Sequence, residues 1–117
     1  MSAVPPNFPV KEAVFYNAFA GDYLEIPCTF RGYPTPSGSW CKLAHGGKQC
    51  ADKQACSKWL SYQTYVKTDR ADNAMLRIPV VRDCDAGNYL CNVTNEALTS
   101  GIQRVIHINV TCMLRSF

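Results

Sequence analysis

The sequence predicts an all-β protein in which two sheets stack into one sandwich, and three observations predict it. The chain has 117 residues, the size of one domain, and 47% of them are hydrophobic, which is enough to fill a single core. Seven cysteines indicate an oxidising compartment and a disulfide-stabilised fold. The third observation is an ordered set of a cysteine, a tryptophan and a Tyr-x-Cys pair: Cys28, Trp40, Tyr89 and Cys91.

The run from Asp85 to Cys91 is the most informative stretch. In an immunoglobulin-like sandwich, a tyrosine two residues before the second core cysteine donates its hydroxyl to the backbone at the turn into strand F. Gly87 permits the tight turn, and alternation along a strand places Tyr89 and Cys91 on the same inward face. We therefore predict a single immunoglobulin-like β-sandwich whose core includes the tryptophan, this tyrosine and Asp85.

The first strand follows a proline-rich start. Residues 1–9, with Pro5, Pro6 and Pro9, are predicted as an irregular lead-in. The immunoglobulin-like domain is predicted to span residues 10–111, and residues 112–117 to begin a stalk or C-terminal tail. Strand A is expected within Phe8–Ala18, where Asn17 could divide it in two.

The later strands follow from alternating apolar residues and from turn residues. Gly32–Pro36 is predicted as the turn between strands B and C. Strands C′ and D are expected within Cys56–Asp69, and residues 53–60 could instead form a helical turn. Because the stretch between C and F is too short for two further edge strands, we predict the intermediate, or I-type, set. The other expected strands are B at Asp22–Phe30, C at Ser39–Leu43, E at Ala74–Val81, F at Gly87–Thr94 and G at Ile102–Val110.

The core disulfide is predicted between Cys28 and Cys91. Closing that loop stabilises the fold by about 4 kcal/mol in the chain-entropy model. Cys41 follows the inward tryptophan, so it is expected to point outward, and a hairpin at the Gly46–Gly47 turn would bring Cys50 within bonding distance.

Three cysteines remain. Cys84 falls at the E–F corner, and Cys112 follows the last strand. We predict a Cys56–Cys84 bond, with Cys112 left as a free thiol or for an intermolecular bond. A Cys84–Cys112 bond is the alternative.

Composition argues against several functions. The net charge of +3 comes without a run of like charges, so neither nucleic acid nor a membrane surface is expected as a partner. No two cysteines have the spacing of a zinc site, and the two histidines, His45 and His107, have no nucleophile or phosphate loop beside them. We expect no enzyme activity, no metal, no cofactor and no small-molecule substrate. Asp85 is expected to form a structural ion pair with Lys67 or Arg70.

Two sequons support secretion. They begin at Asn92 and Asn109, each followed by valine and threonine, and both asparagines are predicted glycosylation sites. The N-terminus lacks the basic head and apolar middle of a signal peptide, and no stretch is long and apolar enough to cross a bilayer. We expect the excised extracellular domain of a membrane-anchored protein.

Four segments resemble the ectodomain of the B and T lymphocyte attenuator family: Ala20–Cys28, Ser39–Leu43, Cys50 and Ser57–Trp59. In that family the cysteine of a Trp-Cys-Lys-Leu segment pairs with a second cysteine one short hairpin later. The resemblance therefore implies the same Cys41–Cys50 bond. The family's extra disulfide from the N-terminal strand has no counterpart, because no cysteine precedes Cys28. Cys56, Cys84 and Cys112 also fall outside the family pattern.

The resemblance implies a leukocyte inhibitory co-receptor. Its partner would be a tumour-necrosis-factor-receptor-type ectodomain such as the herpesvirus entry mediator, bound through the edge of strands A and G. Unpaired N–H and C=O groups let an edge strand extend into a partner. The contact residues would be Val10, Lys11, Ala13, Phe15, Gln103, Arg104 and His107.

A second surface competes with this edge. It is the outward face of strands C, C′, F and G, with Lys42, Asn88, Leu90 and Asn92. A glycan on Asn92 would obstruct it, which favours the edge. Two other functions stay open: a cytokine-binding domain of the interleukin-1-receptor or viral decoy kind, and a homophilic adhesion module.

Overall fold

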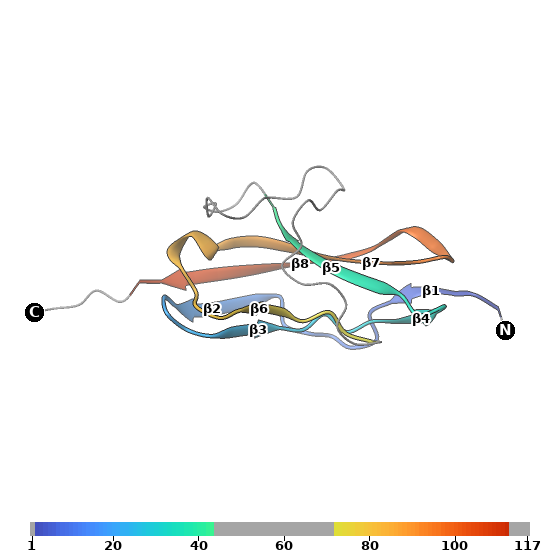
Figure 1. Ribbon diagram of the computed structural model, residues 1–117, viewed down its shortest axis with the longest axis horizontal. Helices are drawn as coiled ribbons and strands as arrows, with labels where there is room; N and C mark the ends of the chain where they lie inside the picture. Colours follow the sequence, from blue (N-terminus) through green and yellow to red (C-terminus); the bar gives the residue numbers. More distant parts are fainter. Residues whose placement is uncertain (1, 44–71, 113–117) are drawn as a thin grey trace, which may run out of the picture.

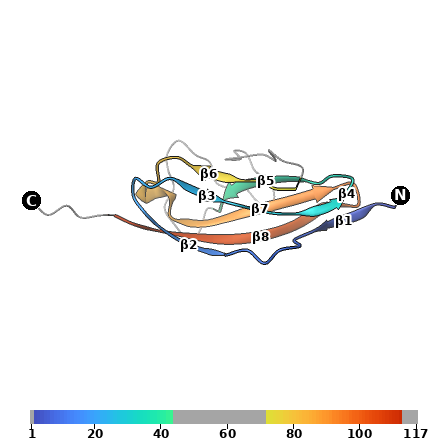
Figure 2. The same cartoon turned by 90° about the horizontal axis from the view of Figure 1, so that it is seen from below.

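The computed structural model describes residues 2–43 and 72–112. In this part the strands form two facing layers (Figures 1 and 2). One layer is a four-stranded sheet in the order β2-β8-β7-β5, and the other consists of the pairs β3-β6 and β1-β4. The strands are β1 (Val4–Asn7), β2 (Phe15–Phe19), β3 (Leu24–Ile26), β4 (Arg31–Tyr33), β5 (Ser37–Lys42), β6 (Leu76–Ile78), β7 (Gly87–Asn95) and β8 (Leu98–Thr111).

Three strands of the four-stranded sheet are antiparallel, and one edge is parallel. β5, β7 and β8 pair antiparallel in sequence order, and β2 joins the free edge of β8 in parallel. β1 and the last residues of β8 lie at opposite ends of the long axis (Figure 1). In the described part of the chain, no helix has the length and apolar character needed to cross a membrane.

A disulfide between Cys28 and Cys91 joins the two layers, as predicted. Trp40 lies directly opposite Cys91 in the β5–β7 register and is fully buried. Its indole N–H donates to the carbonyl oxygen of Ala74 at 2.9 Å, and Ala74 exchanges two backbone hydrogen bonds with Cys28. The tryptophan therefore lies beside Cys91 within the four-stranded sheet and is hydrogen-bonded to Ala74 in the other layer.

The turn before β7 has the predicted tyrosine contact. The Tyr89 hydroxyl donates to the backbone oxygen of Asp85 at 2.7 Å, and both residues are fully buried. The Asp85 carboxylate accepts the backbone N–H of Arg82 at 2.7 Å across the short 3₁₀ turn Asp83–Asp85. Its expected ion-pair partners, Lys67 and Arg70, lie outside the described residues. Gly87 begins β7 with a φ of 139°, which a residue with a Cβ rarely adopts.

Strand A is divided, but not at Asn17. The expected irregular lead-in contains β1, which pairs with β4, and the chain then crosses to the other layer and resumes as β2. Pro5 and Pro6 fit into β1 because it is an edge strand with one neighbour. The break lies at residues 8–14, where the chain changes layers.

Strand B is shorter than predicted. Pro27 follows β3 and brings no N–H to a ladder, so the regular strand ends there. An isolated bridge between Thr29 and Asn73, flanked by backbone hydrogen bonds, continues the pairing before β4. Gly32 and Tyr33, predicted as turn residues, belong to β4. In the other direction, β8 begins at Leu98, four residues before the predicted start. Expected strands C′ and D lie outside the described residues.

Lys42 was predicted on the outward face, and that prediction is wrong. Alternation places it on the same face as Trp40, where it is 1% exposed. Its ammonium donates to the Cys84 carbonyl oxygen and lies 5.9 Å from the centre of the Tyr89 ring. Cys41 occupies the outward face, but it is only 4% exposed.

The other disulfides are described in part. Cys41 and Cys84 are both disulfide-bonded, with partners outside the described residues. The predicted Cys41–Cys50 and Cys56–Cys84 pairings therefore stay predictions. Cys112 is a free, exposed thiol, so the alternative Cys84–Cys112 bond is wrong.

Replacing Tyr89 with phenylalanine tests the contribution of the turn before β7. The change leaves the buried Asp85 carbonyl without its hydroxyl donor, so we expect the free energy of unfolding to fall by about 1–2 kcal/mol in urea titrations. Tyr33→Phe is the control, because Tyr33 is 47% exposed and the change should stay within about 0.5 kcal/mol. Equal losses in both variants would contradict a special role for the buried hydroxyl.

Candidate functional site

The residues predicted to contact a partner gather along one side of β8. Residues 8–14, here called the crossover segment, carry the chain from β1 to β2 and pass beside β8. The backbone N–H of His107 in β8 donates to the Val14 carbonyl at 2.8 Å, where β2 pairing begins. β2 therefore forms the outer edge of the four-stranded sheet beside the C-terminal part of β8, from His107 onward. The crossover segment runs beside the part of β8 that precedes His107.

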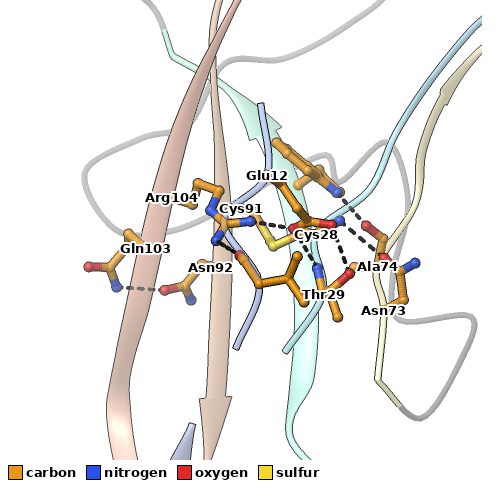
Figure 3. Close-up of a disulfide and its surroundings, with 11 residues drawn as sticks. Glu12, Cys28, Thr29, Asn73, Ala74, Cys91, Asn92, Gln103 and Arg104 are labelled. Carbon is orange, nitrogen blue, oxygen red and sulfur yellow. Dashed lines mark hydrogen bonds and ion pairs between the residues drawn. A yellow bond between two sulfur atoms is a disulfide. The ribbon is translucent and has the colours of Figure 1, made fainter. Parts of the chain in front are cut away.

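A partly buried polar network holds the crossover segment in place (Figure 3). The Glu12 carboxylate accepts the Thr29 backbone N–H at 3.1 Å and the Thr29 hydroxyl at 2.8 Å. The same carboxylate forms an ion pair with the Arg104 guanidinium, and each of these two side chains is 12% exposed. One side chain from the crossover segment thus connects strand β8 to the opposite layer.

Arg104 makes two further contacts to the segment. Its second guanidinium nitrogen donates to the Val10 carbonyl at 3.0 Å, and its central carbon lies 4.3 Å from the centre of the Phe8 ring. Burial, and secondly the Glu12 carboxylate, raise the pKa of the neighbouring Tyr16 phenol, while Arg104 acts in the opposite direction. Arg104 was predicted as a contact residue, but its mostly buried guanidinium is occupied in positioning the segment.

The other predicted contact residues are more exposed. Four of them face solvent: Val10, Lys11 and Ala13 on the crossover segment, and Gln103 on β8. Gln103 also donates its amide to the Asn92 side-chain oxygen at 2.7 Å. These residues form an accessible rim, and the contacts of Glu12 and Arg104 hold the backbone of the crossover segment on its inner side.

Phe15 begins β2, and His107 lies opposite it on β8. Phe15 is 76% exposed, and its ring meets the half-buried His107 ring edge-on with centres 6.4 Å apart. His107 places its Nδ1 2.7 Å from the Asn88 side-chain oxygen. The predicted contact set is thus divided between the crossover segment, β8 and the start of β2.

The sequence analysis missed three groups of exposed apolar residues. Phe19 and Val105 lie on the outward face of β2 and β8, and strict alternation within those strands could have revealed them. Val4 and Tyr33 pair with each other at the β1 end of the molecule. The third group lies at the other end, beyond the β2 terminus, and comprises Tyr23 and Val80.

Nothing in the described ranges resembles a catalytic or metal site. No group of three His, Cys, Asp or Glu side chains there could hold a metal ion. An open depression lies over the β7–β8 hairpin, and its floor includes Leu90, Asn92 and Gln103. These side chains include no pair of a nucleophile and a base.

Comparison with known proteins places the fold in a large family. The immunoglobulin domain family matches residues 5–95. The basement membrane-specific heparan sulfate proteoglycan core protein of Mus musculus is 36% identical over 77 residues, covering 66% of this chain and 2% of that protein. The cell adhesion molecule DSCAML1 of Homo sapiens is 36% identical over 99 residues, covering 80% of this chain and 4% of that protein.

A solved structure agrees in fold. A solved Dscam structure, determined to explain Dscam isoform specificity, superimposes on this chain with a TM-score of 0.68 at 24% identity. The superposition covers 94% of this chain and 25% of the Dscam chain. The chain thus spans a small fraction of the length of the two curated relatives.

A comparison of two ion pairs tests the network. Glu12→Ala leaves the poorly exposed Arg104 and the Thr29 groups without their acceptor, so we expect a loss of about 3 kcal/mol in the free energy of unfolding. Glu25→Ala is the matched control: the Arg77–Glu25 pair is 44% and 42% exposed and should contribute less than about 1 kcal/mol. Urea titration measures both, and a Glu12 loss no larger than the Glu25 loss would contradict the network.

Proposed function

Because the chain belongs to the immunoglobulin domain family, we propose that it is an extracellular protein-binding module of an adhesion or matrix protein. The names of the relatives described above, a cell adhesion molecule and a basement membrane proteoglycan, support this class. The exposed rims and faces of the described residues agree with a protein partner. Seven cysteines and two sequons agree with an extracellular location.

The geometry suits a module linked in series. The chain enters at the β1 end and leaves at the opposite end, after β8 (Figure 1). Exposed apolar side chains lie at both ends: Val4 and Tyr33 at one, Tyr23 and Val80 at the other. A neighbouring domain at either end would remove these side chains from water, which is favourable in proportion to the apolar area covered.

The observation that carries the binding proposal is the held crossover segment. Glu12 and Arg104 fix its backbone from the inner side, so Val10, Lys11 and Ala13 face solvent in a defined arrangement. A pre-positioned segment loses less conformational entropy on binding than a mobile loop does. An extended edge also carries both donors and acceptors, so a second copy of the domain is a suitable partner.

A finer identity rests on the sequence resemblance alone. An inhibitory co-receptor that binds a tumour-necrosis-factor-receptor-type ectodomain stays a hypothesis, because neither curated relative described above is such a receptor. The cytokine-binding alternative has the same standing. Adhesion is placed first because it agrees with the named relatives.

An adhesion assay tests the function. Beads coated with the domain are added to cells that display the same domain and to cells that display the herpesvirus mediator ectodomain. We expect beads to adhere to the cells with the same domain, and the double variant V10D/K11E to reduce adhesion at least tenfold, because it places two negative charges in the contact.

The control variant is Arg31→Glu, a charge change at another exposed position, in β4 on the other layer. Loss with both variants would indicate general electrostatics, and full adhesion of V10D/K11E would remove the crossover segment from the contact. Adhesion only to the mediator would favour the co-receptor hypothesis. No adhesion to either cell type would overturn the proposed function.

A further inference from the structure

The outward face of β2 carries two exposed phenylalanines. Phe15 is 76% exposed and Phe19 is 51% exposed, and both point away from the core because Tyr16 and Ala18 take the inward positions. Only the exposed Asn17 separates the two rings on this face, so a group that covered the face would remove both from water. The question is which group could cover it.

Asn109 lies on the neighbouring strand β8, opposite the residue that separates the two phenylalanines. In the parallel β2–β8 register, Phe15 is opposite His107, Asn17 is opposite Asn109 and Phe19 is opposite Thr111. Alternate residues share a face, so Asn109 projects on the same side as both phenylalanines. Strand spacing and rise place its Cβ about 8 Å from the Cβ of each phenylalanine, on the two diagonals.

Asn109 also begins a sequon, with Val110 and Thr111 following. Its side chain is exposed, and its amide nitrogen makes a long hydrogen bond of 3.3 Å to the Asn17 side-chain oxygen. Because the side chain faces solvent, a substituent on that nitrogen leaves the β8 backbone pairing intact. The amide is therefore both chemically suited and sterically available for N-glycosylation.

We propose that Asn109 carries an N-linked glycan whose first sugars lie across Phe15 and Phe19. The proposal rests on the proposed extracellular function. In the transfer, the Asn109 amide nitrogen bonds to the anomeric carbon of an oligosaccharide supplied by a lipid diphosphate donor. The bond from that carbon to the diphosphate oxygen breaks, the lipid diphosphate leaves and the amide loses one proton. The apolar C–H face of the first sugar then packs on the aromatic rings.

Asn92 is a less suitable acceptor. It is half-buried, and its side-chain oxygen already accepts the Gln103 amide at 2.7 Å. The backbone of Gly101 also approaches so closely that a Cβ there would lie 3.0 Å from this oxygen. Asn92 was predicted as a site from its sequon, but its half-buried side chain is less accessible than the exposed side chain of Asn109, so the proposal is confined to Asn109.

Secretion of the domain from mammalian cells tests the site. Glycopeptide mapping is expected to find Asn109 occupied, and enzymatic removal of the glycan or the N109Q variant is expected to lower Tm by about 4 °C. Where N109Q fails to secrete, Thr111→Ala removes the sequon and keeps the asparagine. An unoccupied Asn109 in folded, secreted protein would overturn the proposal.

A double variant tests the contact with the rings. In F15S/F19S the same deglycosylation should change Tm by less than about 1 °C, because the sugar has lost its aromatic support. An equal shift in both backgrounds would overturn the covering role. Failure of the adhesion function is a separate result, since it is read from bead adhesion and the glycan is read from the mass of the Asn109 peptide.

Discussion

The bond between Cys28 and Cys91 is the constraint on which the other contacts depend. It links the two layers covalently, and Trp40 lies opposite Cys91 while donating to Ala74 on the other layer. Two sheets held at one separation define the space that the remaining apolar side chains fill. The disulfide also limits the unfolded chain, so it stabilises the fold even before any packing is counted.

The crossing of the first strand is the second constraint, and it has a polar solution. A chain that leaves one sheet for the other gives up ladder hydrogen bonds, and buried polar groups need partners. Glu12 supplies them by accepting two hydrogen bonds from Thr29 and pairing with Arg104. A charged pair at this depth is costly to desolvate, so the network does more to specify where the chain crosses than to raise stability.

These two constraints explain what the sequence could predict. The disulfide, the tryptophan and the Tyr89 contact follow from spacing within strands, because alternation decides which side chains face inward. The Glu12–Arg104 pair joins residues 92 positions apart, and no local pattern indicates such a contact. Lys42 shows a different failure: alternation indicated the interior, but the charge suggested the surface, and a carbonyl acceptor with an aromatic neighbour makes the buried position tolerable.

The layer crossing also divides the surface into regions with different chemistry. In the part of β8 that precedes His107, Arg104 turns inward to Glu12, which leaves the exposed rim to Val10 and Lys11. From His107 onward, β2 occupies the sheet edge, and its two outward phenylalanines lie diagonally on either side of Asn109. A bulky glycan on Asn109 would leave the rim of the crossover segment open, because the two lie beside different parts of β8. One strand can thus hold the shielded face and the contact rim without conflict between them.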